Sequence, residues 1–316
     1  MNRNIPTCEV DGIKLSRLML GTAQLGISGY GIANRTGEAD AKSLLDRCAD
    51  LGINCFDTAL EYGDAELKLG AYFAGKQAPF IVSKLKTDLT LDAAAFEKQV
   101  YERTETILQR LRLSKLPVLM IHDPSVLEAY GGLVAAVLGR MRSDGLIERA
   151  GVSLGANSDE QFASVGSLLR NDVYEMIQLP LHLWDRRAIN CGALPQFRQD
   201  HKIVVARSVF LQGLFFGTGE QLPSSLRPRA AVELASLRRI AEAEAMSVEQ
   251  LAVAYVRDTK GVHLLVIGAE RADQIDHNAA LIGCQPLSER ASHEIETLFG
   301  QLPLGLITPG LWPQLP

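Results

Sequence analysis

Eight short apolar segments recur along the chain, and longer amphipathic segments separate them. This alternation constrains the fold more than any other feature of the sequence. Short continuous apolar segments are typical of strands buried on both faces of a parallel sheet. The apolar segments are residues 18–24, 55–59, 80–85, 116–123, 149–154, 176–181, 202–208 and 263–269. Segments with helical periodicity are residues 38–51, 93–113, 126–142, 159–170 and 247–258.

The alternation predicts an α/β fold, specifically a (β/α)8 TIM barrel in which residues 1–316 form a single domain. A doubly wound sheet is the rival fold, but no G-x-G-x-x-G motif follows the first predicted strand. Residues 7–10 and 13–16 flank Asp11-Gly12, a dipeptide typical of a two-residue hairpin turn. We expect this N-terminal β-hairpin to close the bottom of the barrel.

Composition and charge exclude several classes of protein. The chain is 47% hydrophobic and 22% charged with a formal net charge of -5, which excludes a disordered or collagen-like protein. It has no basic stripe that would bind nucleic acid. Its five cysteines are scattered without a C-x-x-C motif, as in a reducing compartment. No signal peptide or membrane-spanning segment is apparent, so we expect a cytoplasmic protein with neither membrane nor nucleic-acid partners.

Polar residues end three neighbouring predicted strands. Asp57 ends the second strand with Tyr62 shortly after it, Lys84 ends the third, and His122 ends the fourth. The carboxyl ends of barrel strands meet at one face, so we expect these side chains around one side of one mouth. A phenol titrates near ~10, and a neighbouring cation lowers its pKa. Lys84, held charged by Asp57, would make Tyr62 an acid for a carbonyl oxygen that His122 orients.

This set contains neither a nucleophile beside a base nor metal-ligand spacing, so no metal is expected. A carbonyl reduction at this site needs a hydride, and therefore a cofactor. Two rival hypotheses stay open. The first is a barrel lyase or aldolase in which Lys84 forms a Schiff base. The second is a non-catalytic, cofactor-sensing subunit that binds a partner protein.

Motifs along nearly the whole chain closely resemble the aldo-keto reductase superfamily. They are GINCFDTALEYGDAELKLG (52–70), the strand-end Lys84, LMIHDP (119–124), GVS (151–153), IQLP (177–180) and RSVFLQGL (207–214). LMLGTAQLG and YGIAN resemble a bacterial branch often seen beside sugar-metabolism genes. The resemblance implies reversible hydride transfer between a nicotinamide and a small aldehyde, ketone or sugar. It makes Tyr62 the general acid/base, Lys84 and Asp57 its tuning pair, and His122 the residue that polarises the carbonyl.

The resemblance also implies an extended NADP(H) or NAD(H) lying across the barrel mouth. Ser153 and Gln178 would bind the nicotinamide carboxamide, and Gly21 and Thr22 would lie beside the cofactor. The backbone of residues 208–213 would approach the pyrophosphate, and residues 268–278 would hold the adenosine end. The individual candidates in these two segments are Ser208, Phe210, Leu211, Gly213, Gly268, Arg271, Gln274 and Asn278.

Some positions depart from common family patterns. Leu154 follows GVS where many members have Asn. Arg207 occupies the place of an aromatic ring that stacks on the nicotinamide, and a guanidinium can also stack on a ring. Glu270 would repel a 2′-phosphate, whereas Arg271 would attract it, and we expect NADP(H) to be preferred with NAD(H) as the alternative. The aromatic candidates for the substrate pocket are Tyr30, Trp184 and Trp312.

Overall fold

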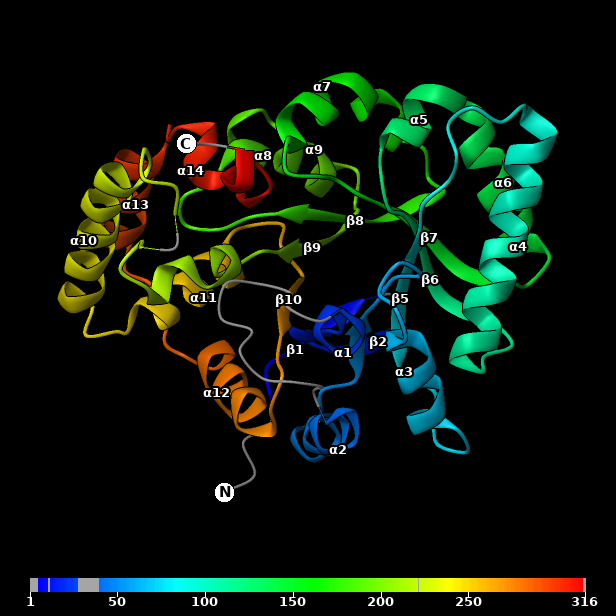
Figure 1. Cartoon of the computed structure of the whole chain (residues 1–316), viewed down its shortest axis with the longest axis horizontal. Coiled ribbons are helices and arrows are strands. Elements are labelled where there is room, and N and C mark those ends of the chain that lie inside the picture. Colours follow the sequence, from blue (N-terminus) through cyan, green and yellow to red (C-terminus); the bar gives the residue numbers. More distant parts are fainter. Residues whose placement is uncertain (1–4, 11, 28–39, 221, 315–316) are drawn as a thin grey trace.

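Eight parallel strands close into a barrel at the centre of the computed structural model, which describes residues 5–10, 12–27, 40–220 and 222–314 (Figure 1). Each strand pairs with the next along the chain, and β10 pairs with β3 to close the cylinder. This closed order confirms the predicted (β/α)8 barrel. The strands are β3 (Leu18–Gly21), β4 (Cys55–Asp57), β5 (Phe80–Leu85), β6 (Leu116–Ile121), β7 (Ile147–Ser153), β8 (Tyr174–Pro180), β9 (Ile203–Arg207) and β10 (Leu264–Gly268).

Helices surround the barrel and cover the outer face of its strands (Figure 1). Within the described ranges, none of them is long and apolar enough to cross a membrane. The α-helices are α1 (Ala23–Gly26), α2 (Ala41–Leu51), α3 (Ala65–Phe73), α4 (Ala93–Leu111), α5 (Ser125–Tyr130), α6 (Gly132–Ser143), α7 (Ser158–Leu169), α8 (Arg187–Asn190), α9 (Ala193–Gln199), α10 (Arg227–Ala243), α11 (Val248–Asp258), α12 (Ala272–Ile282), α13 (Glu289–Phe299) and α14 (Leu304–Ile307). Two 3-10 helices, η1 (Leu211–Phe216) and η2 (Pro309–Gln314), complete the described chain.

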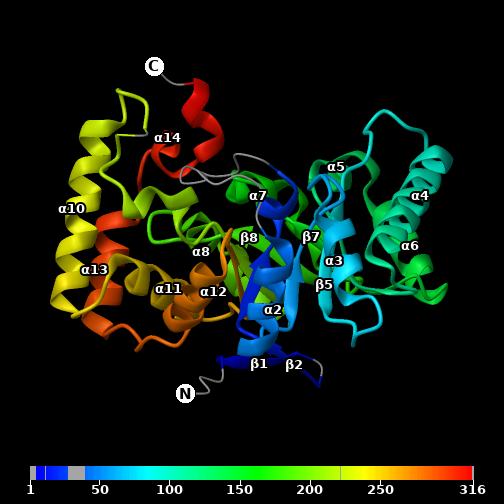
Figure 2. The same cartoon turned by 60° about the horizontal axis from the view of Figure 1, so that its bottom comes forward.

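The N-terminal hairpin lies across one end of the barrel (Figure 2). Strands β1 (Thr7–Val10) and β2 (Ile13–Ser16) pair antiparallel, as predicted. Val10 and Leu15 from this hairpin join the apolar cluster that fills the barrel interior. The hairpin therefore closes the barrel bottom. Of the predicted turn, Asp11 lies outside the described residues and Gly12 has a positive φ of 78°.

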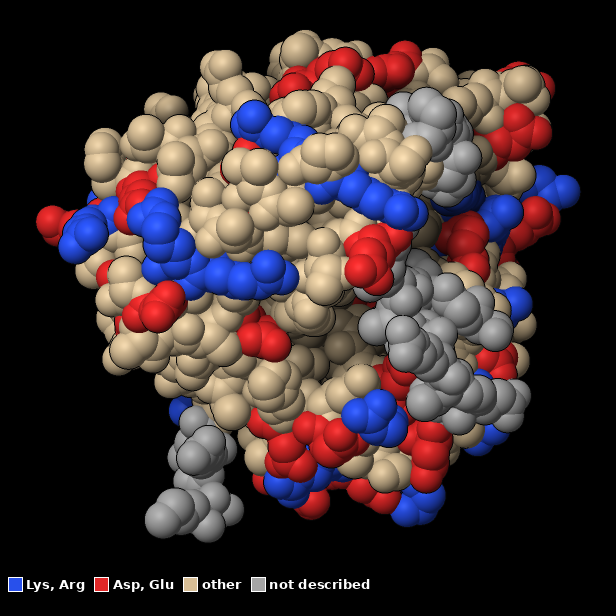
Figure 3. Space-filling model, turned by 60° about the vertical axis from the view of Figure 1, so that its left-hand side comes forward, with Lys and Arg blue, Asp and Glu red and all other residues tan. Residues whose placement is uncertain are grey.

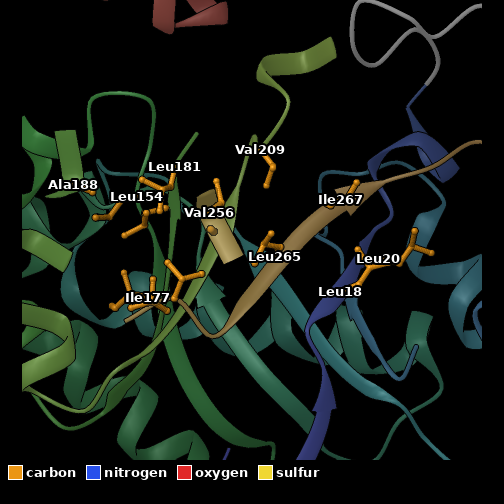
Figure 4. Close-up of a cluster of buried hydrophobic side chains, with 14 of the residues drawn as sticks. Leu18, Leu20, Leu154, Ile177, Leu181, Ala188, Val209, Val256, Leu265 and Ile267 are labelled. Carbon is orange, nitrogen blue, oxygen red and sulfur yellow. The ribbon is translucent and has the colours of Figure 1, made fainter. Parts of the chain in front are cut away.

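Alternate residues of each strand face opposite sides of the barrel wall. On β3, Leu18 and Leu20 pack in the layer between the strands and the helices, whereas Met19 points into the interior. On β10, Leu265 and Ile267 occupy that same outer layer (Figure 4). Apolar side chains therefore fill both faces of these strands, which explains why the strand segments read as continuous apolar runs.

The helix predicted over residues 126–142 is wrong as a single element. The chain forms α5 and then α6, because Gly131 adopts a φ of 51° that breaks the helical path. The segment 217–229 is rich in Gly, Pro and Ser, and α10 begins within it at Arg227. The helix expected over 247–258 is confirmed by α11, and Ser247 and Gln250 form the capping box at its start.

Candidate active site

A buried ion pair forms the base of the candidate site at the carboxyl ends of β4 and β5. Lys84 Nζ lies 2.7 Å from Asp57 Oδ1 and donates a second hydrogen bond to the Thr58 carbonyl oxygen at 2.8 Å. The Lys84 side chain is 0% exposed. Burial lowers the pKa of the Lys84 ammonium, and the Asp57 carboxylate opposes this effect by favouring the charged form.

The Tyr62 and His122 rings lie beside this ion pair. Lys84 Nζ is 5.3 Å from the centroid of the Tyr62 ring. The centroids of the Tyr62 and His122 rings are 6.0 Å apart, with an angle of 75° between the ring planes. The structure thus brings together the four side chains from neighbouring strand ends, as the strand order requires.

Two glycines fix the loop that carries Tyr62. A Cβ atom on Gly26, at the end of α1, would overlap the Tyr62 carbonyl oxygen. A Cβ atom on Gly63 would overlap the Gly26 carbonyl oxygen, and Gly63 also has a φ of 55°. Only residues without a Cβ allow this close approach of two backbones. The glycine contact therefore holds the Tyr62 backbone against α1.

A chain of hydrogen bonds links the predicted carboxamide-binding residues to the ion pair. Ser153 Oγ donates to Gln178 Oε1 at 3.3 Å, and Gln178 Nε2 donates to Asp57 Oδ1 at 2.6 Å. Both side chains are buried. Asp57 Oδ1 therefore accepts from Gln178 as well as from Lys84. The sequence did not reveal this link, because Gln178 and Asp57 are 121 residues apart.

Glu61 is a site residue that the sequence analysis did not single out, although it precedes Tyr62 in the same motif. Its Oε2 lies 3.2 Å from His122 Nδ1. Its Oε1 accepts hydrogen bonds from the Lys86 backbone N–H at 3.0 Å and from Arg103 Nη1 at 3.1 Å. Burial acts to raise the pKa of Glu61, but the hydrogen bonds from His122 and Lys86 hold this pKa below its ordinary value.

A second carboxyl group that was not predicted from the sequence lies near the Lys84–Asp57 ion pair, against Ser83 on β5. Glu66, on α3, is fully buried, and its Oε1 accepts a hydrogen bond from Ser83 Oγ at 2.6 Å. Arg110 Nη1 lies 3.8 Å from its other oxygen. Burial raises the pKa of Glu66 to about 7, because the charged form loses its hydration, and the Ser83 and Arg110 interactions only partly oppose this rise.

A cleft of about 500 Å³ begins at Asp57 and Tyr62 and extends toward β10 and α12. The face shown in Figure 3 is hollowed near its centre, and acidic side chains are among those at the border of the hollow. Most of the residues predicted to bind a dinucleotide line this cleft. They are Gly21, Arg207, Ser208, Phe210, Gly213, Gly268, Gln274 and Asn278.

The backbone after β9 adopts an unusual conformation where it borders the cleft. Ser208, Leu211, Gln212 and Gly213 have φ values of 64°, 47°, 53° and 94°. Positive φ in non-glycine residues costs free energy and clusters at ligand-binding sites. Arg207 anchors this segment, because its Nη2 donates to the Leu154 carbonyl oxygen at 2.9 Å. A preformed backbone cradle of this kind fits the diphosphate part of an extended dinucleotide.

Five of the predicted cofactor residues are not among those that line the cleft: Ser153 and Gln178, described above, and Thr22, Leu211 and Arg271. The Thr22 side chain is buried and donates to the Asp57 carbonyl oxygen at 2.9 Å. The Leu211 side chain is buried in the core and does not line the cleft. Arg271 is exposed and forms two hydrogen bonds to Asp273, at 2.9 and 2.8 Å. Its guanidinium is therefore directed to a surface carboxylate.

The structure places Trp184 and Trp312, two of the three candidates for the substrate pocket, in the hydrophobic core. Trp184 is 1% exposed and packs edge-on against Phe215, with the ring centroids 5.2 Å apart. Trp312 is also buried, and its Nε1 donates to the Gly305 carbonyl oxygen at 2.9 Å. Both indole rings belong to the hydrophobic core. Tyr30, the third candidate, lies outside the described residues.

The comparison with family models matches residues 17–298 to the aldo/keto reductase family. The chain belongs to this family. A similar curated protein is an uncharacterized oxidoreductase of Mycobacterium tuberculosis, 28% identical over 291 residues, a match that covers 86% of each chain. Another is a probable voltage-gated potassium channel subunit beta of Arabidopsis thaliana, 23% identical over 313 residues, covering 87% of this chain and 90% of that protein.

Two solved aldo-keto reductase structures share the fold. The holo form of aldo-keto reductase AKR11C1 from Bacillus halodurans has a TM-score of 0.73 and 20% identity, and the match covers 93% of this chain and 96% of that one. The glycerol dehydrogenase AKR11B4 from Gluconobacter oxydans has a TM-score of 0.72 and 22% identity, with 96% and 98% covered. At these identities the similarity shows a common barrel fold.

Proposed function

We propose that this aldo-keto reductase is a nicotinamide-dependent oxidoreductase that interconverts a small carbonyl compound and its alcohol. The observation that carries the proposal is the buried Lys84–Asp57 ion pair beside the Tyr62 ring. A cation placed beside a phenol, at the edge of a cleft of about 500 Å³, is suited to proton transfer coupled to hydride transfer. The proposed substrate class is a small aldehyde, ketone or sugar.

In the reduction, Tyr62 donates its hydroxyl proton to the carbonyl oxygen. When bound in the cleft, the dinucleotide supplies the hydride that reaches the carbonyl carbon. The Lys84 ammonium stabilises the phenolate left on Tyr62, and Asp57 keeps that ammonium charged in a buried place. His122 hydrogen-bonds the carbonyl oxygen and orients it. In the oxidation, the Tyr62 phenolate takes the proton back from the alcohol.

The charges along the cleft bear on which dinucleotide is preferred. The sequence favours NADP(H) through Arg271, but in the structure Arg271 hydrogen-bonds Asp273. Glu249 and Glu270 line the cleft, and Arg207, at its catalytic end, is the one Lys or Arg among the described lining residues. A carboxylate repels a 2′-phosphate but accepts a hydrogen bond from a ribose hydroxyl. We therefore propose NAD(H) as the preferred dinucleotide, in place of NADP(H).

The Schiff-base rival requires an accessible, neutral amine at Lys84. The Nζ atom instead donates to Asp57 and Thr58, and the side chain is 0% exposed. Treatment with borohydride in the presence of a carbonyl substrate, followed by mass spectrometry, tests this rival. We expect no covalent adduct at Lys84.

The non-catalytic rival gains some support from the relative named as a probable potassium channel subunit beta. A protein of that kind would bind a dinucleotide without turning over any carbonyl and would hold a stable protein partner. The complete arrangement of Tyr62, Lys84 and His122 favours the enzyme instead.

The decisive experiment measures NADH and NADPH oxidation across a panel of aldehydes, ketones and sugars. We expect turnover by the wild type, and a loss of roughly 10²–10⁴-fold in Tyr62→Phe with dinucleotide binding retained. Tyr101→Phe is the matched control, because the Tyr101 hydroxyl donates to Asp144 on the surface, away from the cleft. A wild type that binds dinucleotide but reduces no carbonyl would contradict the proposed function.

A further inference from the structure

Glu61 connects three separate elements to the candidate active site. Its two carboxylate oxygens contact His122 after β6, the Lys86 backbone after β5, and Arg103 on α4. The Glu61 side chain is 26% exposed, and the His122 side chain is 19% exposed. A partly buried carboxylate held by three partners has a fixed position, which makes its contact with the His122 ring a defined one.

The contact determines which nitrogen of His122 carries a proton. A carboxylate can only accept hydrogen bonds, so the hydrogen between Glu61 Oε2 and His122 Nδ1 belongs to the imidazole. The pKa of Glu61, held below its ordinary value, keeps this group ionised at neutral pH. In a neutral His122 ring, Nε2 is then an acceptor. In the charged ring, Nε2 is a donor.

We propose that Glu61 is a positioning residue that fixes the His122 tautomer and acts as counter-ion to its charged form. With Nδ1 donating to Glu61, the charged ring presents its Nε2 hydrogen to the substrate oxygen, which Tyr62 protonates in the reduction and deprotonates in the oxidation. Glu61 would act on the substrate only through His122. The inference rests on the proposed function, but the Glu61–His122 contact exists in the free protein and can be tested without turnover.

Other charges surround Glu61 and His122 and determine how strongly Glu61 stabilises the charged ring. Arg103 shares the Glu61 carboxylate with His122, which weakens Glu61 as a counter-ion without moving it. Lys84 adds positive charge on the barrel side, and Glu66 adds negative charge when it is ionised. Arg110 donates to two carbonyl oxygens of the same loop, those of Leu60 and Gly63. The titratable or charged groups near the pair are Tyr62, Lys84, Arg103, Arg110, Glu66 and Asp123.

The first test reads the His122 tautomer in the free, full-length protein by ¹⁵N NMR of the histidine rings. The His122 signals are assigned by their loss in His122→Asn. We expect the neutral ring to carry its proton on Nδ1 in the wild type and in the conservative variant Glu61→Asp. In Glu61→Gln we expect the proton to move wholly or partly to Nε2. Glu102→Gln is the matched control, because Glu102 pairs with exposed Lys98 on the same helix.

The second test compares the pH profiles of the two reaction directions. In Glu61→Gln the charged ring loses its counter-ion, so we expect kcat for reduction to fall roughly tenfold at neutral pH. As the pH rises, the decline in kcat should begin at a lower pH than in the wild type. The oxidation passes through the same transition state, so its kcat should fall by a similar factor. The KM for the dinucleotide should stay unchanged. Glu61→Asp should recover part of the loss, and Glu102→Gln should match the wild type.

The outcomes separate this inference from the proposed function. A wild-type ring with its neutral proton on Nε2 would overturn the inference. An active enzyme whose Glu61→Gln variant keeps the wild-type tautomer and pH profile would also overturn it, while leaving the function intact. A wild type that turns over no carbonyl would refute the function, and the NMR result would still decide whether Glu61 positions His122.

Discussion

The two sides of the barrel mouth are built differently. On the catalytic side, Lys84, Asp57 and Gln178 are buried and joined by hydrogen bonds between side chains from three strands. On the cofactor side, the segments 208–213 and 268–278 form the cleft through backbone and partly exposed side chains. Proton transfer requires charges held at fixed positions, whereas binding of a long ligand requires an accessible surface. A substitution on the catalytic side should therefore affect folding and chemistry together, and one on the cofactor side should affect binding alone.

The largest effect is expected for Lys84→Met on the catalytic side. The change leaves the Asp57 carboxylate buried without its cation, which should cost about 3–5 kcal/mol of the free energy of unfolding. Turnover should fall roughly 10²–10⁴-fold, because the phenolate on Tyr62 loses its stabilising charge. Urea unfolding and dinucleotide oxidation measure the two effects.

Lys42→Met is the control for this substitution. The Lys42 and Asp46 side chains are 80% and 45% exposed, and a solvent-exposed pair of this kind contributes little to stability. If Lys84→Met were as stable and active as Lys42→Met, the buried pair would not be the structural basis of the catalytic side.

The next effect concerns pH and the buried Glu66. Its folded-state pKa of about 7 lies above the ordinary value of 4.5, so its contribution to stability is fully present below pH 4.5 and is lost as the pH rises through 7. The loss amounts to roughly 3 kcal/mol at most. Glu66→Gln, which cannot ionise, should not show it. The free energy of unfolding of this variant minus that of the wild type should therefore increase from pH 4.5 to 7.5.

The quantity to measure is the difference in the free energy of unfolding between Glu66→Gln and the wild type. His182 also makes stability depend on pH, but in the opposite direction. Burial lowers the pKa of His182 to about 4, so stability from this residue is lost as the pH falls from 6.5 toward 4. Both proteins share that contribution, and it cancels in the comparison. A difference that stays constant with pH would mean that Glu66 is ionised throughout.

The smallest effect is expected for Glu270→Gln on the cofactor side. Removing one carboxylate from the cleft wall removes about 1 kcal/mol of repulsion toward a 2′-phosphate, so NADPH should bind about fivefold more tightly. NADH binding should stay the same or weaken slightly, and the free energy of unfolding should not change. Titration of protein fluorescence with each dinucleotide measures the affinities.

Arg271→Ala accompanies this test, because Arg271 is the residue through which the sequence favours NADP(H). Its exposed contact with Asp273 predicts little change for either dinucleotide. A selective loss of about tenfold or more in NADPH affinity would instead show that Arg271 exchanges Asp273 for the phosphate, and would restore the preference for NADP(H).

The sequence placed the polar residues at the strand ends better than the aromatic candidates for the substrate pocket, for a physical reason. Asp57, Lys84 and His122 each follow directly from the end of an apolar strand, so the strand order alone brings them together. Trp184 was misplaced because a large ring beside a barrel mouth can turn toward the cleft or toward the core. Packing against Phe215 decides between them.

The alternation of apolar and amphipathic segments determined the barrel and the side of its mouth where the polar strand ends meet, and the Asp11-Gly12 dipeptide indicated the hairpin. These features depend on local periodicity and chain order, which a sequence contains directly. Tertiary structure alone decided the contacts of Glu61 and Gln178, the burial of Glu66 and the orientation of Arg271 toward Asp273. Those contacts depend on side-chain directions across elements that are far apart in the chain, and the packing of the whole barrel sets them.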